Sequence, residues 1–317
     1  MSAFEDFIAL QERVRRDDPS VVQLGETRIA RALAALRPTI AVPAQLPRLH
    51  RCHLATAWCA RRGMPDEWSA RALVCEGVRH ALELIFGELA RRGETIAVPS
   101  DVYPVYGQLA EQACVATQPI VTYPALSFAT TARYVLLPCP LKLHGRAWTD
   151  TELGAATAWL GADRSRRLIL DGVYSFDAML PLAVRALIET DQVLMLDSLS
   201  KSWLHEKVFG TAVVPAQDLA AWAPIFRAAA PPQASLFVAR ALLERSVPVA
   251  AELDARRART LAILAERGIA AATVTRGYFI PIELASDVVL ARHRVLVIPL
   301  AVFGGTGAWS FASALSI

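Results

Sequence analysis

The sequence predicts an α/β fold built on a mainly parallel sheet, with a smaller α+β domain beside it. Short β-rich runs alternate with longer helical patterns through the middle of the chain, which is typical of β-α-β units. The chain has 317 residues, which is more than one core usually fills. The alternation also ends after Pro231-Pro232. We therefore expect a large domain over residues 45–245, and a small domain formed by 1–44 and 246–317.

The elements of the large domain follow from this alternation. The predicted strands cover residues 95–99, 118–123, 134–138, 167–171, 192–197 and 210–215. The predicted helices between them cover 77–92, 103–115, 150–161 and 181–189. Thr149 and Glu152 have the spacing of a capping box, which satisfies free N–H groups at the start of a helix.

The two ends of the chain show other patterns. The first forty or so residues are expected to be helical with a break at Gly25, and to fold back on the small domain. A long amphipathic stretch over 233–267 predicts a helix that bridges the two domains. The remainder, with a short final strand that includes Ser310 and Phe311, indicates the small α+β domain.

Composition excludes several classes of protein. The apolar fraction is 54%, but no uncharged apolar run of 18 residues occurs, so no membrane span is expected. The N-terminus lacks the pattern of a secretory signal, which indicates a cytoplasmic protein. A net charge of +3 with dispersed arginines does not suggest nucleic-acid binding. The five cysteines form no CxxC pair, so neither a metal site nor a disulfide framework is expected.

Lysine is rare in this chain. Of 33 basic residues only Lys142, Lys201 and Lys207 are lysines. Arginine stays protonated, whereas a lysine can lose its proton in a desolvated site and act as a nucleophilic amine. The lysines are therefore candidates for chemistry, and Lys201 stands out because it closely follows a predicted strand.

Polar residues follow two of the predicted strands. The run RLILD ends at Asp171 and continues to Tyr174, and QVLMLD continues through Ser198 to Lys201. In open α/β sheets, ligands bind beyond the carboxyl ends of the strands. We therefore expect a site at this edge of the sheet.

These motifs, a strand followed by D-x-x-Y and then a strand followed by S-x-S-K, resemble the class I/II aminotransferases of pyridoxal 5'-phosphate (PLP) fold type I. The resemblance spans roughly residues 65 to 312 in order. It implies a seven-stranded, mainly parallel sheet between helices, PLP as cofactor, a small-molecule amine or amino acid as substrate, and a homodimer.

The resemblance assigns three catalytic residues. PLP needs an amine for a Schiff base and an acid that keeps its pyridine nitrogen protonated. Lys201 matches the Schiff-base lysine and Asp171 the acid that faces the pyridine nitrogen. Tyr174 matches the tyrosine that hydrogen-bonds the phenolic oxygen of the cofactor.

Further residues are expected to bind the cofactor. Gly77 and Val78 begin a helix whose free N–H groups suit a phosphate, and Arg79 adds charge there. Ser198 matches the phosphate-binding serine of the family. Tyr103 matches the aromatic residue that stacks on the pyridine ring.

Two lysines stand where the family has other residues. Lys142 occupies the place of an asparagine that bonds the phenolic oxygen. It could bond that oxygen, lower the proton affinity of the imine, or clamp a substrate carboxylate. Lys207 is the cation nearest to the place of a phosphate-binding arginine. Its neighbours His205 and Glu206 could also reach the site.

The C-terminal pattern departs from the family as well. Ala308 stands where an arginine usually clamps the α-carboxylate of the substrate. The substrate could therefore be an amine without that group, or the carboxylate could be held by Lys142 or by a displaced arginine such as Arg276.

The sequence thus favours a PLP-dependent enzyme, with transamination as the first interpretation. Within PLP chemistry, the alternative is a lyase or cyclase that performs β- or γ-elimination, replacement or retro-aldol cleavage in specialised metabolism. A homologue that has lost catalysis and only binds is a third reading. An NAD-linked oxidoreductase is not favoured, because no GxGxxG follows the first predicted strand.

Overall fold

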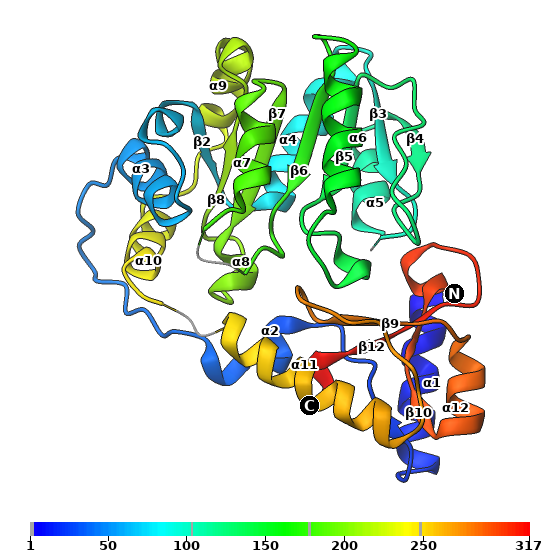
Figure 1. Ribbon diagram of the computed structural model, residues 1–317. Helices are drawn as coiled ribbons and strands as arrows, with labels where there is room; N and C mark the ends of the chain where they lie inside the picture. Colours follow the sequence, from blue (N-terminus) through cyan, green and yellow to red (C-terminus); the bar gives the residue numbers. More distant parts are fainter. Residues whose placement is uncertain (1–2, 103, 177–178, 247–248) are drawn as a thin grey trace.

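The computed structural model describes residues 3–102, 104–176, 179–246 and 249–317, and Figure 1 shows two packed regions. The upper one, here called the sheet region, contains a seven-stranded sheet with the strand order β2-β8-β7-β6-β5-β3-β4. The strands are β2 (Ala72–Cys75), β3 (Thr95–Pro99), β4 (Ala116–Ile120), β5 (Tyr134–Pro138), β6 (Arg167–Asp171), β7 (Val193–Ser198) and β8 (Gly210–Val213). Only β8 runs opposite to the other six strands, so the prediction of a mainly parallel seven-stranded sheet is confirmed.

Helices cover both faces of this sheet, because the strands are apolar on both sides. Ile169 and Leu194 pack against one group of helices, and their neighbours Leu170 and Met195 pack against the other. The first group is α4 (Val78–Arg91), α5 (Val105–Gln112) and α9 (Leu219–Ala228). The second group is α3 (Arg51–Arg61), α6 (Asp150–Gly161), α7 (Leu182–Glu189) and α10 (Gln233–Leu243). A one-turn helix, α8 (Leu199–Ser202), follows β7 directly.

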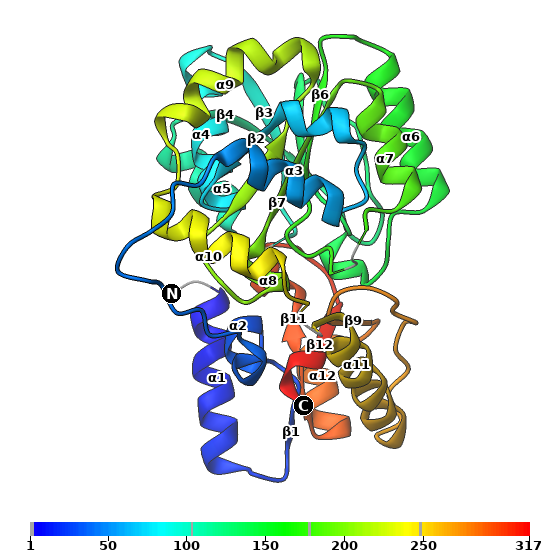
Figure 2. The ribbon, with the colours of Figure 1, turned by 90° about the vertical axis from the view of Figure 1, so that its left-hand side faces the viewer.

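The second region, here called the terminal region, is built from both ends of the chain (Figures 1 and 2). Its strands are β1 (Val22–Gln23), β9 (Phe279–Ile282), β10 (Val295–Leu296), β11 (Ile298–Pro299) and β12 (Ser310–Ser313). Its helices are α1 (Ala3–Asp17), α2 (Ile29–Ala32), α11 (Val249–Glu266) and α12 (Ser286–His293). Because β1 pairs in parallel with β10, and Phe7, Leu253 and Phe311 share one apolar cluster, the two ends of the chain form one core.

Most predicted elements are confirmed, and the differences have local causes. The helix at 150–161 is found with these bounds, and Thr149 and Glu152 form the expected capping box. The amphipathic stretch 233–267 is two helices rather than one bridging helix, since α10 ends at Leu243 in the sheet region and α11 begins at Val249 in the terminal region. The helical stretch predicted at the N-terminus is interrupted over residues 18–28, so the break is much longer than the single position expected at Gly25.

Candidate active site

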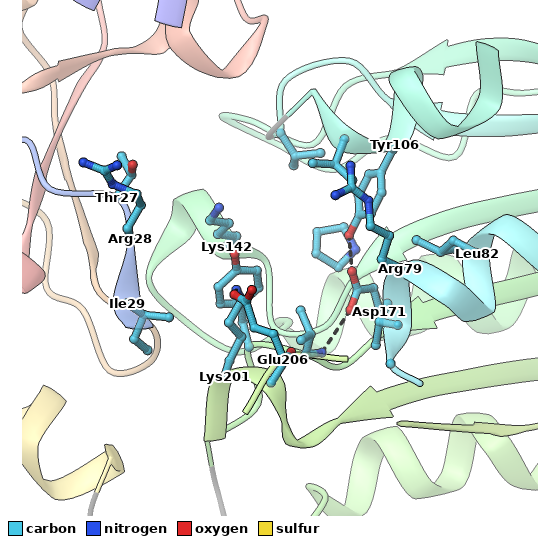
Figure 3. A pocket seen from close by; sticks show the side chains of 18 of the residues that line it. Thr27, Arg28, Ile29, Arg79, Leu82, Tyr106, Lys142, Asp171, Lys201 and Glu206 are labelled. Carbon is cyan, nitrogen blue, oxygen red and sulfur yellow. Dashed lines mark hydrogen bonds and ion pairs between the residues drawn. The ribbon is translucent and has the colours of Figure 1, made fainter. Parts of the chain in front are cut away.

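A cleft of about 1020 Å³ lies between the carboxyl ends of the sheet strands and the terminal region. Its walls come from the start of α4, from α5, from the end of β6 and from α8 on one side, and from residues 27–31 and 302–303 on the other. In Figure 3, Lys142, Lys201 and Glu206 lie between the segment that carries Arg28 and the group formed by Tyr106 and Asp171. A cleft of this size suits a cofactor with a substrate.

Asp171 lines the cleft from the end of β6. The side chain is only 4% exposed, and it accepts hydrogen bonds from the Tyr106 hydroxyl at 2.6 Å and from the Val173 N–H at 3.0 Å. Burial raises the pKa of the Asp171 carboxyl, and these two donors oppose that rise. Asp171 is thus a desolvated carboxylate held in one orientation, which suits pairing with a cation in the cleft.

Lys201 lines the same cleft as Asp171 and comes from the one-turn helix after β7. Its Nζ is 3.3 Å from the Glu206 carboxylate, and its side chain is 23% exposed. Glu206 sits in a turn in which Leu204 and Lys207 both adopt left-handed backbone angles (φ of 59° and 56°). This turn brings a carboxylate to the lysine, five residues along the chain.

The start of α4 faces the same cleft. Gly77 is the N-cap, with a φ of 152° that favours glycine, and Val78 is the first helical residue. Ser198 lies next to Gly77, and its hydroxyl is 2.7 Å from the Ser200 hydroxyl. Since Ser200 lines the cleft whereas Ser198 is almost fully buried, Ser200 is the hydroxyl of this pair that a ligand meets.

Lys142 is enclosed by aromatic rings. Its Nζ lies 4.7 Å from the ring centroid of Tyr174, 5.1 Å from that of Phe279 and 5.8 Å from that of Phe303. Desolvation lowers the pKa of Lys142 to about 7, and the positive charge of Lys201 adds to this lowering. Lys142 is therefore an amine that can change its charge near neutral pH.

A buried ion pair supports the segment that carries Lys201. Arg62 Nε is 2.8 Å from the Asp197 carboxylate, and both side chains are 4% exposed. Asp197 also accepts a hydrogen bond from the Ser198 N–H at 2.7 Å. Burial raises the pKa of Asp197 to about 6, against the opposing effect of Arg62. The pair fixes the end of β7 directly before Ser198.

The structure brings most of the predicted site residues to this one cleft. They are Gly77, Val78, Arg79, Lys142, Asp171, Tyr174, Lys201 and Lys207. Arg79 is 60% exposed and lies 4.0 Å from Glu83, so it sits at the rim. Tyr103 lies outside the described residues.

The remaining candidates lie elsewhere. Arg276 lines a separate, smaller hollow beside Trp148. His205 is buried with its Nε2 2.7 Å from the Pro38 carbonyl oxygen, and it is not among the described residues that line the cleft. Ala308 is exposed and precedes β12.

Three polar residues of the cleft that sequence reasoning missed are Tyr106, Arg28 and Arg31. Tyr106 donates to Asp171, yet its only signal was a place on the predicted helix three residues after Tyr103. Arg28 and Arg31 come from the N-terminal segment, and no local pattern indicated that this segment reaches the cleft. Their contribution depends on how the ends of the chain pack.

Comparison with known proteins finds solved structures of similar fold. No protein-family model matches the sequence, and no curated protein sequence matches it. The structure is similar to an aspartate aminotransferase from Thermotoga maritima, with a TM-score of 0.74 and 14% identity over 99% of this chain and 92% of that one.

Two other solved structures give the same result. An aromatic aminotransferase from Pyrococcus horikoshii is similar with a TM-score of 0.68 and 18% identity, and the alignment covers 98% of this chain and 94% of that one. Escherichia coli YbdL, for which a methionine aminotransferase function is identified, has a TM-score of 0.72 and 17% identity over 99% and 93%. The chain therefore has PLP fold type I, the fold of these aminotransferases. At these identities, the likeness is one of fold.

The groups in the cleft fit PLP. The Lys201 amine can meet the aldehyde of PLP, and the buried Asp171 carboxylate can meet its pyridine nitrogen. The start of α4, with the Ser200 hydroxyl, suits its phosphate. Among the described residues, no group of three or more His, Cys, Asp or Glu side chains is placed to hold a metal ion. None of the described helices has the length and apolar character needed to cross a membrane.

Proposed function

We propose that this protein is a PLP-dependent aminotransferase that acts on a small amine or amino-acid substrate. The observation that carries the proposal is that Lys201 and the buried Asp171 open into one cleft at the carboxyl ends of the sheet strands. The fold shared with three solved aminotransferases supports it. A homodimer stays part of the proposal.

The residues of the cleft would hold the two ends of the cofactor. When bound, PLP supplies a reactive aldehyde and a ring that draws electrons from a substrate carbon. Lys201 Nζ would bind the aldehyde carbon. The Asp171 carboxylate would hold the proton of the pyridine nitrogen, because Tyr106 and Val173 keep it oriented. The N–H groups at Gly77 and Val78, with Ser200 and Lys207, would hold the phosphate, and the buried Ser198 would orient the Ser200 hydroxyl.

Lys201 and Lys142 are the amines to which we assign proton transfer in the cleft. Lys201 Nζ could carry a proton to or from the substrate carbon. Lys142 Nζ, with its pKa of about 7, can gain or lose a proton at neutral pH beside the Tyr174 ring. We propose that Lys142 and Tyr174 face the phenolic oxygen of the cofactor.

Reconstitution with PLP tests the proposal. The purified chain should gain a visible absorbance band, and borohydride should fix the mass of the cofactor on Lys201 in a peptide map. Lys201→Ala should abolish both signals, and the control Arg37→Gln, at an exposed residue outside the cleft, should keep the label on residue 201. A label on another lysine, or none, contradicts the proposal. Subsequent incubation with amino acids should yield pyridoxamine phosphate, whereas release of ammonia would indicate a lyase.

A further inference from the structure

The wall of the cleft opposite Asp171 carries two arginines from the N-terminal segment. Arg28 and Arg31 line the cleft together with Thr27 and Ile29. In Figure 3, Thr27, Arg28 and Ile29 lie across the cleft from Asp171, with Lys142 and Lys201 between the two walls. This wall therefore offers charged groups on the side of Lys201 that is opposite to Asp171.

One carboxylate holds both arginines loosely. Arg28 Nε lies 3.6 Å from Oε1 of Glu26, and Arg31 lies 3.7 Å from its Oε2. Both distances are longer than the donor–acceptor distance of a hydrogen bond. Oε1 of Glu26 already accepts the Thr27 and Arg28 N–H groups at 2.9 and 2.8 Å. Two guanidinium groups thus share one acid, and this wall has a net positive charge.

This placement answers the question that Ala308 raises. Ala308 offers no cation, and Arg276 lines a different hollow. Arginine matches a carboxylate because its planar N–H groups can donate two parallel hydrogen bonds. We propose that Arg28 and Arg31 form the carboxylate clamp of this cleft, so that the substrate is an amino acid rather than a simple amine.

The inference rests on the proposed function, and its test separates the two. The chain is first saturated with PLP, which fills the anion site at Gly77, and is then titrated with succinate by calorimetry. Succinate should bind, and its neutral counterpart succinamide should not. Arg28→Gln and Arg31→Gln should each weaken succinate binding about tenfold or more, because each removes hydrogen bonds to a charged group.

Two further variants control the result. Arg37→Gln removes an exposed arginine outside the cleft of the same segment and should bind succinate as the original chain does. Arg28→Lys keeps the charge but loses the fork of donors, so it should lie between the original chain and Arg28→Gln. The inference is overturned if succinate does not bind, or if both glutamine variants bind it normally. Failure of PLP to attach to Lys201 would instead overturn the proposed function.

Discussion

Gly210 and Gly77 meet backbone to backbone where the antiparallel strand β8 passes the start of α4. A Cβ atom added to Gly210 would lie 2.5 Å from the Gly77 Cα and 2.9 Å from the Asp197 carbonyl oxygen. Atoms of the backbone cannot yield to such a contact as the end of a side chain can. The start of α4, which we assign to phosphate binding, can therefore lie this close to β8 because Gly210 has no side chain.

Replacing Gly210 by alanine should displace this helix start. We expect Gly210→Ala to lower the free energy of unfolding by about 1–3 kcal/mol, as overpacking does, and to weaken PLP binding. Gly87→Ala on the same helix is the matched control, because nothing lies within 4 Å of its added Cβ. It should stabilise the protein by about 0.4–1 kcal/mol. Urea unfolding and PLP titration measure both effects, and equal behaviour of the two variants would refute the close contact.

Removal of the Tyr106 hydroxyl should weaken the hold of Asp171 on a cationic ring. Tyr106→Phe deletes the 2.6 Å hydrogen bond and leaves the Val173 N–H as a donor to that carboxylate. The pKa of Asp171, already raised by burial, should rise further. We expect PLP to bind about tenfold more weakly, since a hydrogen bond to a charged group is lost. Tyr134→Phe, a buried tyrosine of β5 that does not line the cleft, should leave the affinity unchanged.

Lys142 should make the stability of the protein depend on pH. Unfolded, lysine keeps its proton to about pH 10.4, whereas folding lowers the pKa of Lys142 to about 7. Between these values the unfolded state binds more protons, so stability rises with pH across this window. Below pH 7 both states are protonated, and the folded state bears the full cost of a desolvated cation.

The variant Lys142→Met isolates this effect. Relative to the original chain it should be most stabilised below pH 7, and the difference should shrink as the pH rises toward about 10. Chemical unfolding at several pH values measures the difference. Lys207→Met removes an exposed lysine and serves as the control, with a difference that stays flat. A flat difference for Lys142→Met as well would show that Lys142 is hydrated.

The buried pair of Arg62 and Asp197 should be costly to break. Arg62→Leu leaves a buried carboxylate without its cation. We expect it to lower the free energy of unfolding by about 4 kcal/mol. Arg133→Leu breaks an exposed pair with Glu94 and should cost about 1 kcal/mol or less. Adding Asp197→Asn to Arg62→Leu should recover part of the loss. Guanidinium unfolding gives the three values, and similar costs for Arg62→Leu and Arg133→Leu would mean that the inner pair is not desolvated.

The sequence predicted those parts of the fold whose signals are local. The strand at 167–171 and the capped helix at 150–161 were found with the predicted bounds, because an apolar run and a capping box each define their own ends. The strand β2 was missed, since four residues with no distinct pattern become a strand only by pairing with β8. The break between α10 and α11 was likewise invisible, because the amphipathic pattern continues across it.

The candidate site divides in the same way. Asp171, Tyr174 and Lys201 were predicted because each lies at the end of a strand or a few residues after it, in motifs that resemble those of the aminotransferases. Tyr106 and the arginines of the N-terminal segment depend on contacts between distant parts of the chain. Arg28 lies more than 170 residues from Lys201, and no spacing in the sequence relates the two.

The segment with Arg28 and Arg31 is itself anchored at the far end of the chain, since the Glu26 N–H donates to the Ser316 hydroxyl at 3.0 Å. Ser316 therefore supports the segment that we expect to select the substrate, although the two lie 290 residues apart in the sequence. We expect a change at Ser316 to act on ligand preference through this contact rather than through Lys201 or the sheet.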